Sequence, residues 1–222
     1  MRNIRSGWQA RSFVLPLLFA LSLTACARHG AEAPAASSPP AFAKIIAVED
    51  HRKFAEHPRD PSTPTLNDAA DFGNQDRMAR AVGRQRDLDG ATGANIFLPA
   101  NETVARLVRA AIEKALRDKG YTLVAEGSPH YGAASSLSAQ ITQFWIWQRP
   151  GMLAQPAEFR TAVVVTGDAL LEPSTTIESY ATDDSADIGA SRWRQIMDAG
   201  IGDLGKKLGE RLKPPSGGSV SE

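Results

Sequence analysis

The sequence predicts an α+β fold, in which a mostly antiparallel β-sheet carries two amphipathic helices on one face as a two-layer sandwich. Three observations support this class. Strand-like segments follow one another in the second half of the chain, one helical pattern lies near the middle, and another lies near the C-terminus. Strands joined by short connections favour antiparallel pairing, and helices segregated from such a run pack on a sheet face.

The two helices are predicted from apolar periodicity. The segment from Glu102 to Lys119 carries apolar residues at the spacing of one helix face. These residues are Val104, Leu107, Val108, Ala111, Ile112, Ala115 and Leu116. Asn101 suits the N-cap, and Gly120 suits the left-handed position after the last turn. The second helix is predicted from about Ser191 to Leu212.

The predicted strands are short segments rich in β-branched and aromatic residues. They comprise residues 43–48, 95–98, 121–125, 136–147, 159–171 and 176–182. A long loop is predicted at about 49–94, because this stretch is rich in Asp, Arg, Pro and Gly. Pro58, Pro61 and Pro64 interrupt regular structure there, and a short helix is predicted near residues 76–82.

The charge balance and the cysteine count exclude several classes of protein. The 25 Lys and Arg residues equal the 25 Asp and Glu residues, so the chain is not a strongly basic binder and no nucleic-acid partner is expected. The single cysteine, Cys26, excludes a disulfide framework and a Cys₄ zinc site. The first 25 residues contain three Arg and no acid, so the remainder is mildly acidic.

The N-terminus has the layout of a bacterial export signal. A basic start precedes an apolar run from Phe13 to Ala25, which is shorter than the roughly 20 residues that a transmembrane helix requires. Leu23, Thr24 and Ala25 stand directly before Cys26. This tetrapeptide resembles the lipobox of bacterial lipoproteins.

The lipobox resemblance implies cleavage before Cys26, a diacylglycerol on its thiol, and a further acyl chain such as palmitate on its new amine. Two or three acyl chains anchor a protein stably in a membrane. Ala27 rather than Asp follows the cysteine, which by the same resemblance favours the outer membrane over the inner one. We therefore expect a lipid-anchored protein on the periplasmic face of the bacterial outer membrane, with the membrane as a partner through this lipid.

Four parts of the chain are predicted from these patterns. Residues 1–25 are the lipoprotein signal peptide, and residues 26–41, rich in Ala, Pro and Ser, are a flexible tether. Residues 42–212 are a single periplasmic α+β domain that includes the long loop. Residues 213–222 are a disordered tail.

Three short motifs of the mature chain resemble the YajG-like family of bacterial lipoproteins. The first is Val48-Glu49-Asp50-His51-Arg52, close to a Val-x-Asp-x-Arg pattern, and the second is Val82-Gly83-Arg84 followed by Asp89-Gly90. The third is a helix that ends in Lys119-Gly120-Tyr121. The resemblance implies an outer-membrane lipoprotein with a periplasmic domain, and it implies no known activity and no catalytic residues.

No catalytic or metal-binding pattern stands out in the chain. The sequence contains no GxSxG, P-loop or dinucleotide fingerprint, so no catalysis is expected. His51, Glu56, His57 and Asp60 are close in sequence but lack the HExxH spacing, so no metal site is expected. No cofactor is expected other than the covalent lipid on Cys26.

The aromatic run Phe144-Trp145-Ile146-Trp147 is the candidate contact with an envelope protein partner. Strict alternation predicts that Trp145 and Trp147 continue the core face of the strand, while Phe144 and Ile146 point the other way. A strand that is apolar on both faces is either exposed to a partner or covered by the chain itself, through the 49–94 loop or the 148–158 loop. Aromatic residues are enriched in interface hot spots.

The sequence therefore leaves three functions open. The first is a lipid-anchored periplasmic binding or scaffold module without catalysis. The second is a carrier of a small apolar ligand or lipid, held between the sheet and the helices. The third is an envelope enzyme.

Overall fold

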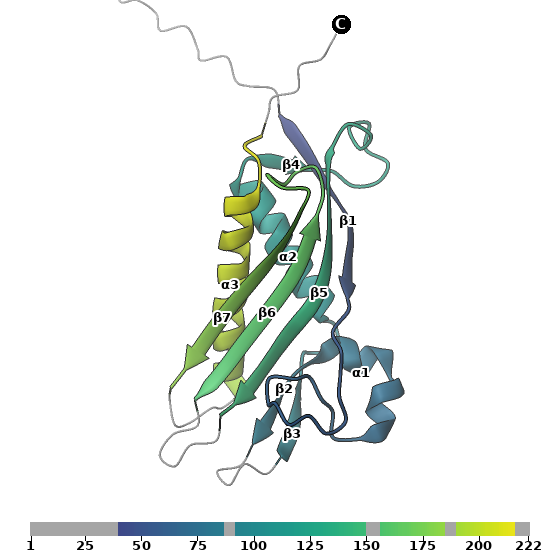
Figure 1. Ribbon diagram of the computed structural model, residues 1–222. Helices are drawn as coiled ribbons and strands as arrows, with labels where there is room; N and C mark the ends of the chain where they lie inside the picture. Colours follow the sequence, from purple (N-terminus) through teal and green to yellow (C-terminus); the bar gives the residue numbers. More distant parts are fainter. Residues whose placement is uncertain (1–39, 87–91, 150–155, 185–189, 216–222) are drawn as a thin grey trace, which may run out of the picture. The chain divides into compact units, whose positions relative to one another are not determined.

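The computed structural model describes residues 40–86, 92–149, 156–184 and 190–215 (Figure 1). Within these residues, the elements in chain order are β1 (Ala41–Asp50), the 3₁₀-helix η1 (Ala69–Gly73), α1 (Gln75–Arg80), β2 (Ala81–Arg86), β3 (Thr92–Phe97), α2 (Val104–Asp118), β4 (Tyr121–Leu123), β5 (Ser135–Gln148), β6 (Ala157–Thr166), β7 (Ser174–Asp183) and α3 (Ala190–Arg211). The predicted signal peptide, Cys26 and most of the predicted tether lie outside the described residues, so these assignments stay predictions.

The seven described strands form one mixed sheet, organised around the 14-residue strand β5. One edge of β5 pairs antiparallel with β6, and β6 pairs antiparallel with β7. The other edge pairs parallel with β1 along its first half and parallel with β2 near its end. Strand β1 also pairs parallel with β4, and β2 also pairs antiparallel with β3.

The prediction of a mostly antiparallel sheet is therefore wrong, although the α+β class holds. The consecutive strands β5, β6 and β7 do form the expected antiparallel meander. The error lies at β4 and β5, which are consecutive in sequence but do not pair with each other, because β1 lies between them and is parallel to both. Parallel pairing needs a long crossover, and the chain between β1 and β4 includes α2.

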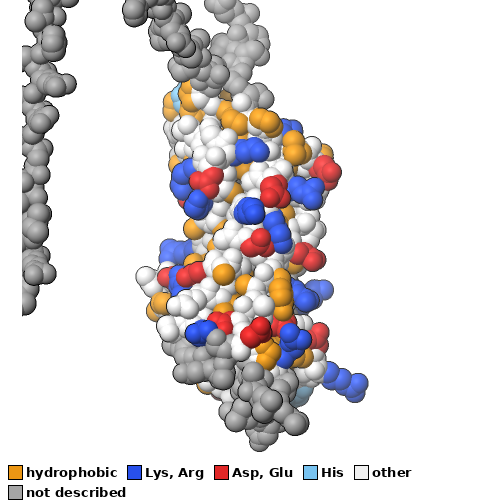
Figure 2. Space-filling model, turned by 90° about the vertical axis from the view of Figure 1, so that its left-hand side faces the viewer, with side chains coloured by type: hydrophobic (Ala, Val, Ile, Leu, Met, Phe, Trp, Pro, Cys, Tyr) orange, Lys and Arg blue, Asp and Glu red, His pale blue; other side chains and the backbone are white. Residues whose placement is uncertain are grey.

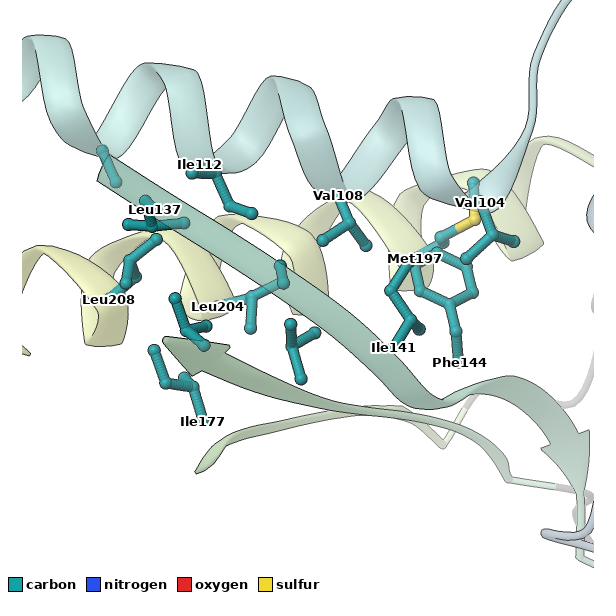
Figure 3. Packing of buried hydrophobic residues seen from close by; sticks show 14 of the residues in the cluster. Val104, Val108, Ile112, Leu137, Ile141, Phe144, Ile177, Met197, Leu204 and Leu208 are labelled. Carbon is teal, nitrogen blue, oxygen red and sulfur yellow. The ribbon is translucent and has the colours of Figure 1, made fainter. Parts of the chain in front are cut away.

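The main core lies between the sheet and the two long helices, α2 and α3, which pack on the same face (Figures 1 and 3). Figure 3 shows Val108 and Ile112 of α2, Leu204 of α3 and Leu137 of β5 in this core. All four side chains are buried. The predicted apolar stripe of α2 faces the core: Leu107 is partly buried, and the other six residues, Val104, Val108, Ala111, Ile112, Ala115 and Leu116, are buried.

A glycine sets how closely α3 approaches the sheet. A Cβ atom at Gly200 would lie 2.1 Å from a ring carbon of Phe159 on β6, so only glycine fits this contact. Ser179 of β7 donates a hydrogen bond of 2.6 Å to the carbonyl oxygen of Gly200. The close approach therefore joins α3 to both β6 and β7.

The helix ends differ from the prediction in one detail. Thr103, not Asn101, is the N-cap of α2, and its hydroxyl accepts a hydrogen bond from the Arg106 amide. Gly120 takes the left-handed conformation expected of it, with φ of 101°. Lys213, the first residue of the predicted tail, is hydrogen-bonded to the domain: its amide donates to the Ala169 carbonyl oxygen, and its carbonyl oxygen accepts from the Tyr121 hydroxyl. Residues 216–222 of the predicted tail lie outside the described residues.

The predicted long loop at 49–94 contains regular structure. It holds η1, α1, β2 and the first residues of β3. The predicted helix near 76–82 is α1, which ends at Arg80, and the chain then enters β2. A glycine at position 83 permits β2 to pair with β5, because a Cβ atom there would lie only 2.7 Å from the Ile146 carbonyl oxygen of β5.

A β-bulge in β5 overturns the predicted faces of the aromatic run. In the pairing with β6, Ile141 faces Val163 and Gln143 faces Ala162, so Thr142 is the additional residue. One additional residue moves every later side chain to the opposite face. Phe144 and Ile146 therefore join the main core, while Trp145 and Trp147 lie on the other face of the sheet.

Candidate apolar binding site

All four residues of the aromatic run are buried within the chain. Phe144, Trp145 and Ile146 are 0% exposed and Trp147 is 4% exposed. Figure 3 places Phe144 beside Ile141 and Met197 in the main core. The prediction of an exposed partner contact at Phe144–Trp147 does not fit this burial. The alternative that the sequence left open, a cover supplied by the chain itself, describes the molecule.

Residues 51–80, named here the covering segment, lie over Trp145 and Trp147. The two tryptophans form a second, smaller core with Leu66 and Ala81, bordered by Phe54, Phe72, Met78 and Phe97. Phe54 meets the Trp145 ring edge-on, with 6.0 Å between the ring centroids. Gln143 of β5 also donates a hydrogen bond of 2.8 Å to the Ser62 carbonyl oxygen of the segment.

The buried side chain of Arg52 holds the covering segment against the sheet. Its guanidinium donates to the Asp50 carboxylate at 2.7 to 3.1 Å. It also donates to the carbonyl oxygens of Ala81 at 2.6 Å, Met78 at 2.8 Å and Phe144 at 3.1 Å. Asp50 and Arg52, two residues of the Val-x-Asp-x-Arg pattern, therefore link β1, the α1–β2 junction and β5, which is a structural role.

An apolar pocket lies on the opposite side of β5 from these tryptophans. It has a volume of about 270 Å³ between β2, β3, β5 and α3. Its lining residues are Val82, Ile96, Phe97, Leu98, Pro99, Ile146, Trp193, Arg194 and Met197. We name this site the β2–α3 pocket. Apolar walls with few polar groups are typical of small-molecule sites.

Three separate features of the sequence build the β2–α3 pocket. The bulge at Thr142 turns Ile146 toward the helices. Gly83 of β2 pairs with Ile146 of β5, and this pairing brings the adjacent Val82 into the pocket wall. Trp193 and Met197 are four residues apart in α3 and so lie on one face of that helix.

Trp193, one of the residues that line this pocket, carries a buried polar atom. The residue is 3% exposed, and its indole Nε1 is buried with no hydrogen-bond partner among the described residues. The indole N–H can only donate a hydrogen bond. A buried donor without an acceptor costs free energy, and most buried polar groups in proteins are paired.

Arg194 is the charged residue among the described residues that line the pocket, and it is paired. Its guanidinium donates to Glu102 at 2.7 Å and to Asp198 at 3.0 Å. The hydrogen bond to Glu102 is the largest cause that raises the pKa of Arg194 above its ordinary value. The guanidinium therefore stays protonated, and both of its ion pairs stay formed at neutral pH.

A second hollow runs along the outer side of α2 and α3. It has a volume of about 490 Å³ and is lined by small residues such as Ala111, Ala115 and Gly205, with lysine and aspartate side chains beside them. Figure 2 shows the side of the molecule on which α3 lies, with positive and negative side chains interspersed among small hydrophobic patches. Mixed charges of this kind are typical of solvated surface.

The described part of the chain was also searched for clusters of metal-ligating side chains. No group of three or more His, Cys, Asp and Glu side chains there could hold a metal ion. The Nε2 atom of His51 instead lies 3.0 Å from a carboxylate oxygen of Glu49. The Asp60 carboxylate accepts a hydrogen bond from the Ser62 amide, and this bond lowers the pKa of Asp60. In the same residues, no helix is both long and apolar enough to cross a bilayer.

Comparisons with known proteins add little to these observations. No protein-family model and no curated protein matches the chain. Among solved structures, the chain is similar to a Xanthomonas campestris protein of family DUF330, at 9% identity and a TM-score of 0.42, over 79% of this chain and 86% of that chain. A minor lipoprotein of Acinetobacter baumannii has 9% identity and a TM-score of 0.35, over 49% and 84% of the two chains. A hypothetical protein of Chlamydia trachomatis has 10% identity and a TM-score of 0.39, over 77% and 98%. Likenesses this low carry no inference about the function of this chain.

The predicted contact residues and the residues of the pocket are thus largely different. Sequence reasoning singled out Phe144–Trp147 as a surface, whereas Ile146 lies in the wall of a pocket and both tryptophans are covered. Trp193 falls within the helix predicted from about Ser191 to Leu212, and no sequence pattern assigns it to a site. The tryptophan near the start of α3 was the one local signal for this pocket. The sequence alone does not reveal the pocket, because the other wall residues, on β2 and β3, come from distant parts of the chain.

Proposed function

We propose that this chain is a lipid-anchored binding module of the bacterial cell envelope. Cys26 attaches it to the periplasmic face of the outer membrane, and the β2–α3 pocket binds an apolar group. The observation that carries the binding proposal is the apolar pocket of about 270 Å³ between β2, β3, β5 and α3. The lipobox residues Leu23 to Cys26 support the anchor.

Burial of the aromatic run favours a binding pocket over a scaffold surface. A scaffold that binds through its side chains shows an exposed apolar patch. The large apolar side chains that are exposed among the described residues are Ile46 on β1, Leu171 in the β6–β7 connection and Tyr180 on β7. Among the described residues that line the pocket, one is ionisable, Arg194, and it is committed to two ion pairs, so we propose binding without catalysis.

The binding proposal is tested with a neutral apolar fluorophore, N-phenyl-1-naphthylamine, and the mature chain without lipid. We expect saturable fluorescence enhancement with the wild-type chain. Ile96→Trp fills the pocket and should weaken binding at least tenfold. The matched control is Ile46→Trp, because Ile46 is 51% exposed on β1 and lies outside the pocket. Equal enhancement in Ile96→Trp and the wild type, or none in either, would contradict the proposal.

The anchor proposal is tested by cell fractionation. Cys26→Ala removes the thiol that receives the lipid, so we expect the protein to leave the membrane fraction. Ala27→Asp keeps the cysteine and should move the protein toward the inner membrane. Retention of Cys26→Ala in the outer membrane would show that another part of the chain provides the attachment.

A further inference from the structure

We infer that one end of the domain contacts the lipid bilayer directly, and that the side chain of Leu171 enters the bilayer surface there. The contacting end is the one at which β1 begins, named here the anchor-side end. This inference rests on the proposed function, because it takes the lipid on Cys26 as the anchor. Three observations carry it: the place where the described chain begins, the exposure of Leu171, and the contacts that fix its turn.

The chain leaves the domain toward its anchor at the anchor-side end. The described residues begin at Pro40, directly before β1, and Cys26 precedes Pro40 by fourteen residues. Fourteen residues span at most about 50 Å when fully extended and roughly 20 Å as a random coil. Figure 1 shows that β6 ends, β7 begins and α3 ends at this same end of the sheet. The anchor-side end is therefore the part of the domain that the anchor keeps closest to the bilayer.

Hydrogen bonds connect the start of β1 to the turn between β6 and β7. Ala41 of β1 pairs with Tyr121 of β4. The Tyr121 hydroxyl donates to the Lys213 carbonyl oxygen, and the Lys213 amide donates to the Ala169 carbonyl oxygen. Leu171, two residues after Ala169, therefore lies at the same end of the domain as the residue from which the chain leaves toward Cys26.

Leu171 is the most exposed of the large apolar side chains among the described residues. It is 56% exposed, compared with 51% for Ile46 on β1 and 45% for Tyr180 on β7. The preceding residue, Leu170, is 1% exposed and belongs to the main core. An exposed leucine side chain gains free energy when it moves from water into an apolar environment. The apolar interior of the bilayer offers Leu171 that environment.

The turn holds Leu171 in a defined position. The Leu171 amide donates to the Arg211 carbonyl oxygen at 2.8 Å, and the Gly167 amide donates to the Pro173 carbonyl oxygen at 3.0 Å. Only glycine fits at position 167, because a Cβ atom there would overlap the Ser136 carbonyl oxygen of β5. A side chain on a backbone that is already fixed loses little conformational freedom on binding. The turn therefore presents Leu171 in advance of the contact.

The charges beside Leu171 balance, so the contact is apolar rather than electrostatic. Residues 167–173 and 211–215 carry two exposed cations, Arg211 and Lys213, and two exposed carboxylates, Asp168 and Glu172. Clusters of Lys and Arg attract anionic lipid headgroups, but this balanced set provides no such excess of positive charge. We therefore expect the contact to depend on Leu171 and to be insensitive to salt.

The test places the fluorophore NBD on the full lipidated chain, reconstituted in vesicles of phosphatidylethanolamine and phosphatidylglycerol. Lipid occupies the Cys26 thiol, so Leu171→Cys, Ile46→Cys and Tyr180→Cys each offer one reactive site. At position 171 we expect emission at shorter wavelength and about twofold quenching by lipids brominated on their acyl chains, because an apolar group in the interface lies roughly 5 to 10 Å deep. Ile46→Cys and Tyr180→Cys are the matched controls, since these exposed residues lie further along β1 and β7 from the anchor-side end, and they should show neither change.

A second measurement gives the strength of the contact. The mature chain carries an N-terminal hexahistidine tag in place of the lipid and binds the same vesicles through a sparse chelator lipid. Leu171→Asp should weaken this binding about threefold to tenfold, in low and in high salt alike. Ile46→Asp, at a similarly exposed aliphatic position, should leave the affinity unchanged.

The outcomes separate this inference from the proposed function. If the lipidated chain floats with the vesicles but NBD at position 171 stays unshifted, the inference is overturned while the anchor proposal stands. A shift at position 171 in the chain without lipid and without vesicles would mean that a second copy covers Leu171, and it would also overturn the inference. Failure of the full chain to float with the vesicles would overturn the anchor proposal itself.

Discussion

Near the C-terminal end of β5, the apolar side chains on the two faces of the strand are covered in different ways. On one face, Trp145 and Trp147 are closed off by the covering segment, which Arg52 fastens through six hydrogen bonds to side-chain and main-chain oxygens. On the other face, Ile146 and Trp193 line a pocket of about 270 Å³. The tryptophans of the first face are buried under the chain itself, whereas the second face borders an apolar pocket. This difference teaches that the second face is the one suited to a ligand.

The largest expected effect is on the covered face. Arg52→Ala removes the guanidinium and leaves the Asp50 carboxylate and three carbonyl oxygens without their partner. We expect a loss of about 3 kcal/mol in the free energy of unfolding, measured with urea. Lys53→Ala, at an exposed neighbouring position, should change it by less than about 0.5 kcal/mol. A loss below about 1 kcal/mol in Arg52→Ala would show that the covering segment is held by apolar contacts alone.

The next effect concerns the close approach of α3, which supports the pocket face. Gly200→Ala would force a methyl group into the Phe159 ring, so we expect a loss of about 1 to 3 kcal/mol in stability. Gly202→Ala, two residues on, meets open space and should stabilise the helix by about 0.5 to 1 kcal/mol. Thermal unfolding of the pair measures the difference. Equal changes in stability for Gly200→Ala and Gly202→Ala would mean that α3 does not pack on β6 as closely as described.

A smaller effect is expected at Trp193 in the absence of ligand. Trp193→Phe reduces the buried apolar area but also removes the unsatisfied donor, and these two changes oppose each other. We expect the free energy of unfolding to change by less than about 1 kcal/mol, measured with urea. A much larger loss would indicate that the indole N–H has a partner in the folded protein.

The smallest effect is a pH dependence in the covering segment. The Ser62 amide hydrogen bond lowers the pKa of Asp60 below 3.8 in the folded protein. A lowered pKa stabilises the fold above the unfolded value, and this contribution is lost as the pH falls through the folded value. The stability difference between the wild type and Asp60→Asn should therefore shrink as the pH falls below 3.8. A difference that is constant from pH 6 to pH 2 would contradict this assignment.

Local patterns predicted much of the fold. The helix periodicity of residues 102–119 gave the buried face of α2, because a helix face depends only on spacing along the chain. The strand positions followed in the same way for β1, β5, β6 and β7. The parallel pairings of β1 were missed, because they depend on which strand inserts between β4 and β5, and this is a property of the whole chain.

The candidate site was less accessible to sequence reasoning. Strict alternation assigned Ile146 to the outer face, because nothing in residues 136–147 marks Thr142 as a bulge. Strand β2 was interpreted as loop, although it brings Val82 into the pocket wall. The pocket combines residues of β2, β3, β5 and α3, so only their tertiary arrangement reveals it.

The bulge at Thr142 can also be regarded as a phase slip. The apolar pattern before it and the apolar pattern after it each repeat every two residues, but they are out of step by one. Deleting Thr142 would restore a single phase along β5. The two tryptophans would then turn toward the helices, and Ile146 would leave the pocket wall. The additional residue Thr142 thus decides which face of β5 carries the two tryptophans and which face borders the pocket.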